Sequence, residues 1–252
     1  PSVFKGTVKQ NRTVLAVGLD SLSLAHIKKD VYARPQLIGV VKGLDQADLM
    51  QQFQAKKGDF ITAFKALEIE QTQQRFKRSL NQEKGIENLL GVGLDIPSAY
   101  RLGMHTESFA WIDRAIPSGS SNIIAYALPY NSFNSPDTFI EDIVAARDSV
   151  VKIHIPGPDV PGKTTYMKTE TVFMPYVTPA EIAGYKGVEI RGIWDIQNYP
   201  MAGPFVAYIL NDPDQDRKIV LEGFVFAPNK EKRTPLFELE AIIKTLHPIL
   251  KE

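Results

Sequence analysis

The second part of the chain is a long succession of strand-forming segments, and only two helical patterns interrupt it. Such segments are found near residues 99–104, 107–114, 121–129, 164–174, 186–196, 203–211 and 217–226. Apolar residues recur at helical spacing through 137–151 and again from Pro235 to His247. The resulting order, β-β-β-α-β-β-β-β-α, predicts an α+β sandwich in which an antiparallel sheet carries helices on its faces.

The first 95 residues follow a different pattern. Runs rich in Val, Ile and Leu at 11–20 and 36–43 predict two buried strands. A helical pattern from Leu44 to Ser79 is interrupted at Gly58-Asp59, which predicts two helices, and 81–90 predicts a short one. We therefore expect a smaller N-terminal α/β segment over 1–95 and the sandwich domain over 96–252.

Composition excludes several classes of function. Lys plus Arg and Asp plus Glu balance at 29 each, so the chain has no basic field that would attract nucleic acid. The longest apolar runs have the length of strands, which predicts no transmembrane segment. The absence of cysteine excludes disulfides, thiolate metal ligands and a cysteine nucleophile.

One stretch matches a nucleotide-binding motif letter by letter. GPDVPGKT (157–164) fits the phosphate-binding pattern G-x-x-x-x-G-K-[ST]. A working phosphate loop leads into a helix whose free N–H groups hold the phosphates, but here a β-branched, strand-like segment follows. Pro158 and Pro161 each remove a further amide donor. We interpret the stretch as a connector and expect no nucleotide cofactor.

The candidate metal ligands are also weak. Asp212, Asp214 and Asp216 have the spacing that opens a calcium loop, but Arg217 and Gly223 stand where that loop needs Gly and Glu. The four histidines lie far apart in the sequence, without the i,i+4 spacing of a helical metal site. We expect no metal site and no cofactor.

The stronger signal is a set of charges at positions where apolar residues belong. In helix 137–151, Arg147 lies in the middle of the stripe formed by Ile140, Ile143, Val144 and Val151. A buried arginine is costly unless carboxylates and other acceptors satisfy it. Glu222 alternates with Phe224 and Phe226, so Arg147–Glu222 is one possible pair, and a network of Arg191, Glu189 and Glu222 is another.

These charges leave three interpretations open. They form a structural ion-pair network, or they bind a ligand, or two of the carboxylates, Glu189 and Glu222, perform acid–base chemistry as in a hydrolase. The ligand interpretation places Glu189, Arg191 and Glu222 on the floor of one polar pocket. Its candidate residues are Trp111, Arg147, Glu189, Arg191, Trp194, Tyr208 and Glu222.

Several segments resemble an uncharacterised family of Bacteroidetes cell-envelope proteins, the domain of unknown function 4837. The resemblance is carried by WDIQNYPMAGPFVAYIL, LEGFVFAPNKEKRTPLFELEAI, ARDSVVKIHIPGPD, GYKGVEIRGIWD and VYARPQLI. Most members of that family carry a lipoprotein signal, and they begin with a strand–helix segment upstream of PSVFKGT. The resemblance therefore implies a chain truncated at its start, whose full-length form is lipid-anchored in the periplasm or outer membrane.

The element order after residue 96 also resembles the PsbP-type sandwich, whose members mostly serve as binding or assembly modules. This analogy and the lack of a catalytic constellation favour a non-enzymatic module that binds an envelope protein or a small ligand. A carboxylate-based hydrolase and a purely structural or interaction protein are the alternatives.

Overall fold

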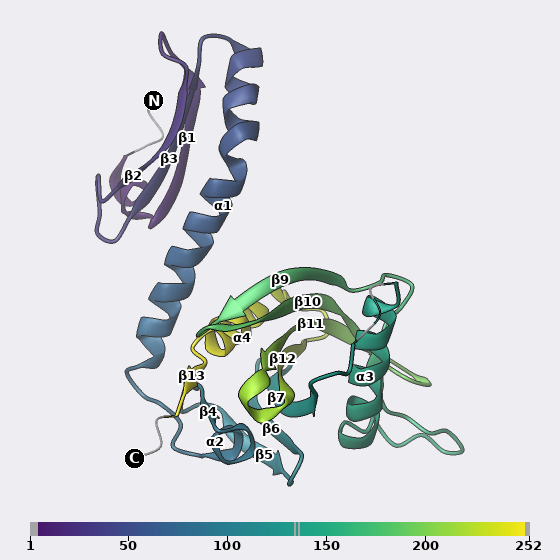
Figure 1. The fold of residues 1–252 in the computed structure, drawn as a ribbon. Coiled ribbons are helices and arrows are strands. Elements are labelled where there is room, and N and C mark those ends of the chain that lie inside the picture. The colour runs from purple at the N-terminus through teal and green to yellow at the C-terminus, as the bar shows by residue number, and fades with distance from the viewer. Residues whose placement is uncertain (1–4, 134, 136, 250–252) are drawn as a thin grey trace. The chain divides into compact units, whose positions relative to one another are not determined.

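The computed structural model describes residues 5–133, 135 and 137–249, and it divides into two compact units (Figure 1). The units are Pro1–Gln74 and Arg75–Glu252. This division falls before residues 75–95, which the sequence places in the N-terminal segment. Residues 75–95 belong to the second unit because α2 (Gly85–Leu90) packs on its sheet and β4 (Val92–Gly93) pairs with β13 (His247–Pro248).

The first unit is a three-stranded sheet with a helix on one face. Its elements are η1 (Gly6–Gln10), β1 (Thr13–Leu19), β2 (Leu24–Lys29), β3 (Leu37–Gly43) and the greater part of α1 (Gln46–Phe76). The strand order is β1-β3-β2, with β1 parallel and β2 antiparallel to β3. Gly39 of β3 lets Phe60 and Phe64 of the helix approach the sheet closely.

Two expectations for this unit are corrected. The helix is continuous through Gly58-Asp59, because one glycine costs a helix only about 1 kcal/mol, and long helical segments on both sides outweigh that cost. Strand β2 was not predicted, because its sequence, LAHIKK, contains a histidine and two lysines and lacks a regular apolar alternation. β1 lies at the edge of the sheet and leaves Leu15, Val17 and Leu19 exposed.

The second unit contains one large antiparallel sheet. Its further strands are β5 (Arg101–His105), β6 (Phe109–Ile116), β7 (Gly119–Pro129), β8 (Met167–Thr169), β9 (Tyr176–Ile182), β10 (Tyr185–Ile196), β11 (Tyr199–Asp212) and β12 (Arg217–Phe226). Its further helices are α3 (Phe139–His154), η2 (Pro213–Gln215) and α4 (Arg233–Ile243). The strand order is β5-β6-β7-β12-β11-β10-β8, and β9 also pairs with β10.

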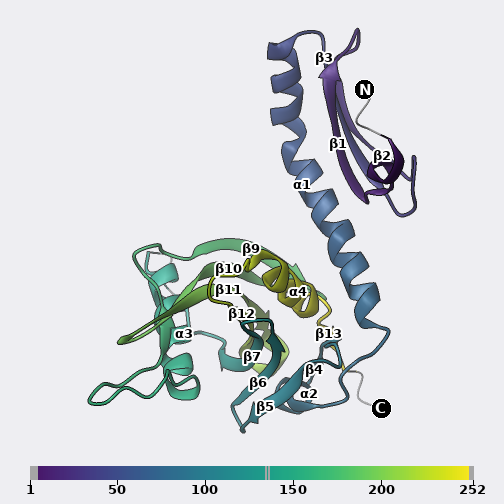
Figure 2. The ribbon, with the colours of Figure 1, turned by 180° about the vertical axis from the view of Figure 1, so that it is seen from behind.

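Helices cover both faces of this sheet (Figure 2). On one face, Ile143 and Val151 of α3 pack into a core with Phe109, Trp194 and Phe224. On the other, α4 packs against β12, β11 and β7, and Gly223 provides the space for Leu239. The α+β class that the sequence predicts is confirmed.

The edge beside β10 departs from the expected strand near 164–174. Its pairing is shared between two strands, with β8 opposite Trp194–Ile196 and β9 opposite Tyr185–Arg191. β9 was missed because Pro179 interrupts its pattern, although a proline is tolerated in a strand at the edge of a sheet. The predicted turn over 211–216 is present, and η2 lies within it.

Candidate functional site

Arg147 occupies the position that the sequence predicts, in the middle of the buried face of α3. Ile143, Arg147 and Val151 are buried at successive turns of the helix. The guanidinium group donates two hydrogen bonds to Glu222, from Nε to Oε2 at 2.8 Å and from Nη2 to Oε1 at 2.7 Å. Bidentate, charge-assisted pairs of this kind are strong and fix the relative geometry of both side chains. The predicted Arg147–Glu222 pair is therefore present.

Further contacts engage Nη1 and the flat face of the Arg147 guanidinium group. Its Nη1 donates to Thr169 Oγ1 at 2.9 Å and lies 3.3 Å from Asp148 Oδ1, and the guanidinium carbon lies 4.2 Å from the centre of the Phe205 ring. Burial lowers the pKa of Arg147, but the charge and hydrogen bonds of Glu222 outweigh burial and raise the pKa above its ordinary value. These contacts tie α3 to β8 and β12.

A second polar cluster lies on the α4 face of the sheet. Arg191 donates from Nε to Glu189 Oε1 and from Nη2 to Glu240 Oε2, both at 2.6 Å. The Tyr208 hydroxyl donates to Glu189 Oε2 at 2.6 Å, and Lys244 pairs with Glu240 at 3.1 Å. Glu240 was not among the predicted site residues. Its position next to Leu239 in the apolar stripe of α4 was the available signal.

The two clusters lie on opposite faces of the sheet, so the single pocket that the sequence predicts is wrong. Glu222 is opposite Ala207, which in turn is opposite Ile190 of the α3-side core. Glu189 is opposite Tyr208 and points to the other face. A strand presents successive side chains to opposite faces, so register separates Glu222 from Glu189.

This separation also removes the hydrolase alternative. Glycoside chemistry requires its two carboxylates to flank one bond in an open cleft. Glu222 is fully buried beneath α3, whereas Glu189 is held by Arg191 and Tyr208 on the opposite face. The pair cannot act on one substrate.

The two tryptophans predicted as pocket walls have other roles. Trp194 is fully buried and packs edge-on against Phe224. Trp111 is partly buried and donates from Nε1 to Asn122 Oδ1 at 3.1 Å. Both belong to the α3 side of the sheet, so neither can line a cavity with Tyr208.

The sequence GPDVPGKT has the structure of a connector. Val160 and Lys163 form an isolated bridge, and Gly157 N–H donates to the Thr165 carbonyl at 3.1 Å. The next element is strand β8 rather than a helix, so no helix N-terminus follows to hold a phosphate. Among the described residues, no three His, Asp or Glu side chains gather as metal ligands.

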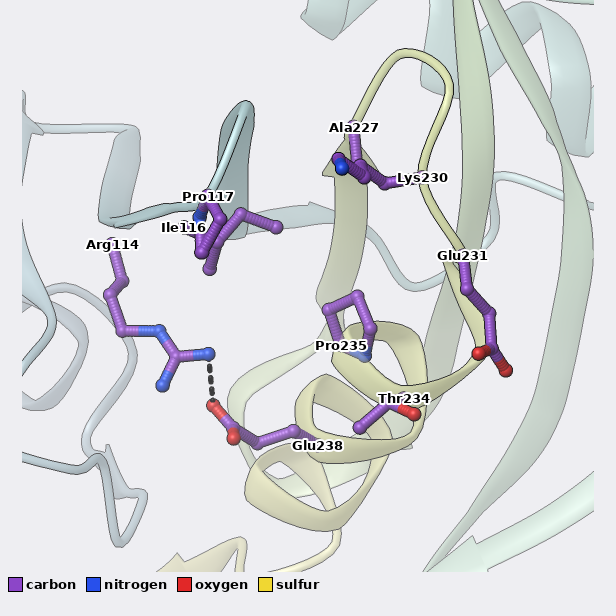
Figure 3. Close-up of a pocket in the computed structure, with 9 residues that line it drawn as sticks. All are labelled: Arg114, Ile116, Pro117, Ala227, Lys230, Glu231, Thr234, Pro235 and Glu238. Carbon is purple, nitrogen blue, oxygen red and sulfur yellow. Dashed lines mark ion pairs between the residues drawn. The ribbon is translucent and has the colours of Figure 1, made fainter.

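A depression of about 350 Å³ lies where the N-terminal turn of α4 meets the end of β6 (Figure 3). It is lined by Arg114, Ile116, Pro117, Ala227, Lys230, Glu231, Thr234, Pro235 and Glu238. Its arginine is already engaged, because Arg114 pairs with Glu238 at 2.9 Å and lies over the Tyr100 ring at 5.0 Å. Glu238 also accepts from the Tyr100 hydroxyl. Arg114 and Glu238 are therefore engaged with each other and with Tyr100, although Arg114 Nε is buried without a hydrogen-bond partner in the domain.

An exposed apolar segment lies between β8 and the start of β9. We define the apolar arch as Val172, Phe173 and Met174 together with Tyr176, the first residue of β9. Their side chains are 80%, 70%, 46% and 71% exposed, respectively. Soluble proteins expose single apolar residues freely, but contiguous apolar surface usually marks an interaction site.

The arch is held at the edge of the sheet by the strands on both sides. Glu170 N–H donates to the Ile193 carbonyl at 2.8 Å, and Val172 N–H donates to Glu170 Oε1 at 2.7 Å. Pairing with β10 resumes at Tyr176, opposite Arg191. The arch therefore spans the position of Gly192 and Ile193. The sequence pattern does not predict it, because Val172, Phe173 and Met174 continue the apolar pattern of the strand expected near 164–174.

The second unit is thus an α+β domain with internal ion-pair networks on both faces of its sheet and an apolar arch at one edge. The chain belongs to the family of the Domain of unknown function (DUF4837), whose model matches residues 79–245. The Domain of unknown function (DUF8532) matches residues 1–77. These two matches meet close to the division between the structural units.

Comparison with solved structures finds similarity to the Ran-binding protein Mog1p of Saccharomyces cerevisiae, with a TM-score of 0.37, and to a point mutant of protein Mog1, with a TM-score of 0.35. In both cases the identity is 8%, and the similarity covers 63% of this chain and 90% of the other. No curated protein matches significantly. No helix among the described residues is long and apolar enough to cross a membrane.

Proposed function

We propose that this chain is a non-enzymatic, protein-binding module of the cell envelope and that the apolar arch is its contact surface. The exposure of the arch carries the proposal. Val172, Phe173 and Tyr176 are each at least 70% exposed, and aromatic and methionine side chains are enriched where proteins bind one another. A partner that covers them would remove this apolar area from water.

The engaged polar groups support binding rather than catalysis. Arg147, Glu222, Glu189 and Arg191 all make short hydrogen bonds within the domain. We infer that they position elements of the fold. Protein binding is favoured over small-ligand binding because the apolar arch is exposed, whereas the depression beside α4 has its arginine paired.

We further propose that the full-length protein is lipid-anchored in the periplasm or outer membrane. The resemblance of the segments quoted above to envelope proteins supports this location. Fractionation of cells that produce the native protein tests it. We expect the protein in the membrane fraction and its release by detergent. Recovery from the cytosol would contradict the proposed location while leaving the binding proposal open to its own test.

The binding proposal is tested by site-specific photo-crosslinking in the native host. A photoreactive phenylalanine analogue replaces Phe173, or, as a matched control, Ile153. Ile153 is 75% exposed but lies on α3, outside the arch. We expect a discrete crosslinked protein with the probe at 173 and none with the probe at 153.

The interaction is then measured with the purified partner. Phe173→Ser should weaken binding by at least about 30-fold, as expected for loss of an aromatic hot-spot residue, and Ile153→Ser should leave the affinity unchanged. Because both side chains are exposed, both variants should keep the unfolding midpoint of the parent chain. Identical crosslinking at positions 173 and 153, or none at 173, would contradict the proposal.

A further inference from the structure

The surface beside the apolar arch carries carboxylates that the domain compensates only in part. Asp195 lies in β10 across from Lys168 of β8, and its Oδ2 is 3.6 Å from Lys168 Nζ. That separation is long for a charge-assisted hydrogen bond, which is usually shorter than 3 Å. The other carboxylate oxygen, Oδ1, is buried and has no hydrogen-bond partner.

Glu170 adds a second negative charge at the same place. Its backbone is hydrogen-bonded to Ile193 in β10, and its carboxylate holds the N–H of Val172 at the start of the arch. Burial raises the pKa of Asp195 above its ordinary value. The charge of Lys168 opposes this shift, and the charge of Glu170 adds to it. A second carboxylate therefore lies near the Asp195–Lys168 pair, at the start of the exposed apolar residues.

The nearby network around Arg147 does not provide a second cation for Asp195. Arg147 is committed to Glu222 and Thr169 on the α3 face, and Asp148 Oδ1 is committed to the N–H and hydroxyl of Thr169 at 2.8 Å and 2.6 Å. A buried or half-buried carboxylate is costly unless a donor satisfies it. The Asp195 side chain is 24% exposed, so a cation of a partner can approach it from solvent even though Oδ1 is buried.

Strand addition is a poor way to bind at this edge. In the β9–β10 hairpin, Ala183 and Gly184 form the two-residue turn, both with positive φ. The backbone N–H and C=O groups of Ile182 therefore bond to β10. Those of Val177, Pro179 and Glu181 point outward, away from β10. Pro179 has no N–H to offer an added strand. The partner must therefore use side chains.

We propose, on the basis of the protein-binding function above, that the partner presents a basic and apolar segment. An apolar side chain of this segment packs on Phe173, and a Lys or Arg side chain one or two residues away pairs with Asp195 and Glu170. Apolar contact supplies most of the affinity, and the cation supplies selectivity, because a partner with a carboxylate at that position would face two like charges.

A random peptide library displayed on phage and selected on the full chain tests this inference. We expect selected peptides to combine Phe, Leu or Trp with a nearby Lys or Arg. Representative peptides should bind at least about 10-fold more weakly when their basic residue is replaced by Gln, a loss in the range measured for charge pairs at interfaces.

The variants Asp195→Asn and Asp214→Asn form a matched pair on the protein side. Asp214 is exposed in η2, and β11 separates it from Asp195 by about 30 Å of strand. We expect Asp195→Asn to reduce the preference for basic peptides several-fold and to flatten the salt dependence of binding. Asp214→Asn should change neither quantity.

The outcomes separate this inference from the function on which it rests. If selected peptides bind through Phe173 but are acidic or uncharged, or if Asp195→Asn keeps the preference for basic peptides, the inference is overturned and the binding function stands. If binding does not depend on Phe173, the contact surface itself is wrong.

Discussion

At the scale of single residues, the charges at apolar positions mark where the domain is held together. An arginine in the apolar stripe of a helix requires a carboxylate partner, and Arg147 has one in Glu222. Sequence can predict such a pair because the helix period fixes the direction of Arg147. It could not separate Glu222 from Glu189, because the face of each glutamate depends on how β10, β11 and β12 are aligned.

The buried pair leads to a prediction about stability. Arg147→Leu and Glu222→Leu should each cost about 3–5 kcal/mol of unfolding free energy, because each leaves a buried charge without its partner. The double variant should recover most of that loss, since two apolar side chains fill the same space without charge. Urea denaturation of the four proteins measures the coupling. Additive losses in the double variant would show that the two residues do not act as a pair.

Buried tyrosines lead to a prediction about pH. Burial raises the pKa of the Tyr126 and Tyr208 phenols well above the ordinary value of tyrosine. The charge of Glu222 raises the pKa of Tyr126 further, and the charge of Glu240 does the same for Tyr208. Above about pH 10 the unfolded chain releases these protons while the folded chain retains them, so stability is lost as pH rises. The loss should approach about 1.4 kcal/mol per pH unit for each tyrosine.

The control for this effect is Tyr126→Phe, which removes one of the phenols. Urea midpoints followed from neutral to alkaline pH should fall less steeply for this variant than for the parent chain. Ultraviolet titration should show both phenols ionising only as the domain unfolds. Ionisation of all tyrosines near pH 10 without loss of structure would contradict the burial of these side chains.

At the scale of elements, the strongly patterned segments were predictable and the irregular ones were not. Strands β7, β11 and β12 and helices α3 and α4 form close to the expected residues, because their apolar periodicity is regular. Helix α1 was divided in error at Gly58. Residues 172–174 favour β structure and are predicted as the end of the strand near 164–174, whereas in the structure they form part of the exposed arch.

The continuity of α1 can be tested with alanine substitutions at two glycines. No atom lies within 4 Å of the Cβ that Gly58→Ala adds, so in a continuous helix this variant should gain up to about 1 kcal/mol of stability. Gly43→Ala is the contrasting variant, since its Cβ would lie within 3 Å of the Leu49 backbone, and it should destabilise the unit. Thermal unfolding measures both, and a loss of stability in Gly58→Ala would indicate a break in the helix.

At the scale of the whole molecule, α+β class and the family could be read from the sequence, but the candidate site could not. The predicted site residues turned out to lie on two faces of one sheet, where they hold α3 and α4 in place. The apolar arch carries no distinctive motif, and its exposure follows from how β8 and β9 share the edge of β10. The exposure of these side chains can be determined only from the tertiary structure.

The central claim is that the buried charges maintain the fold while the apolar arch binds the partner. The most direct measurement compares the affinity of the crosslinked partner for Phe173→Ser with its affinity for the folded double variant Arg147→Leu/Glu222→Leu. We predict that Phe173→Ser loses binding at unchanged stability and that the double variant binds as the parent chain does. Full binding by Phe173→Ser, together with loss of binding by the folded double variant, would contradict the account.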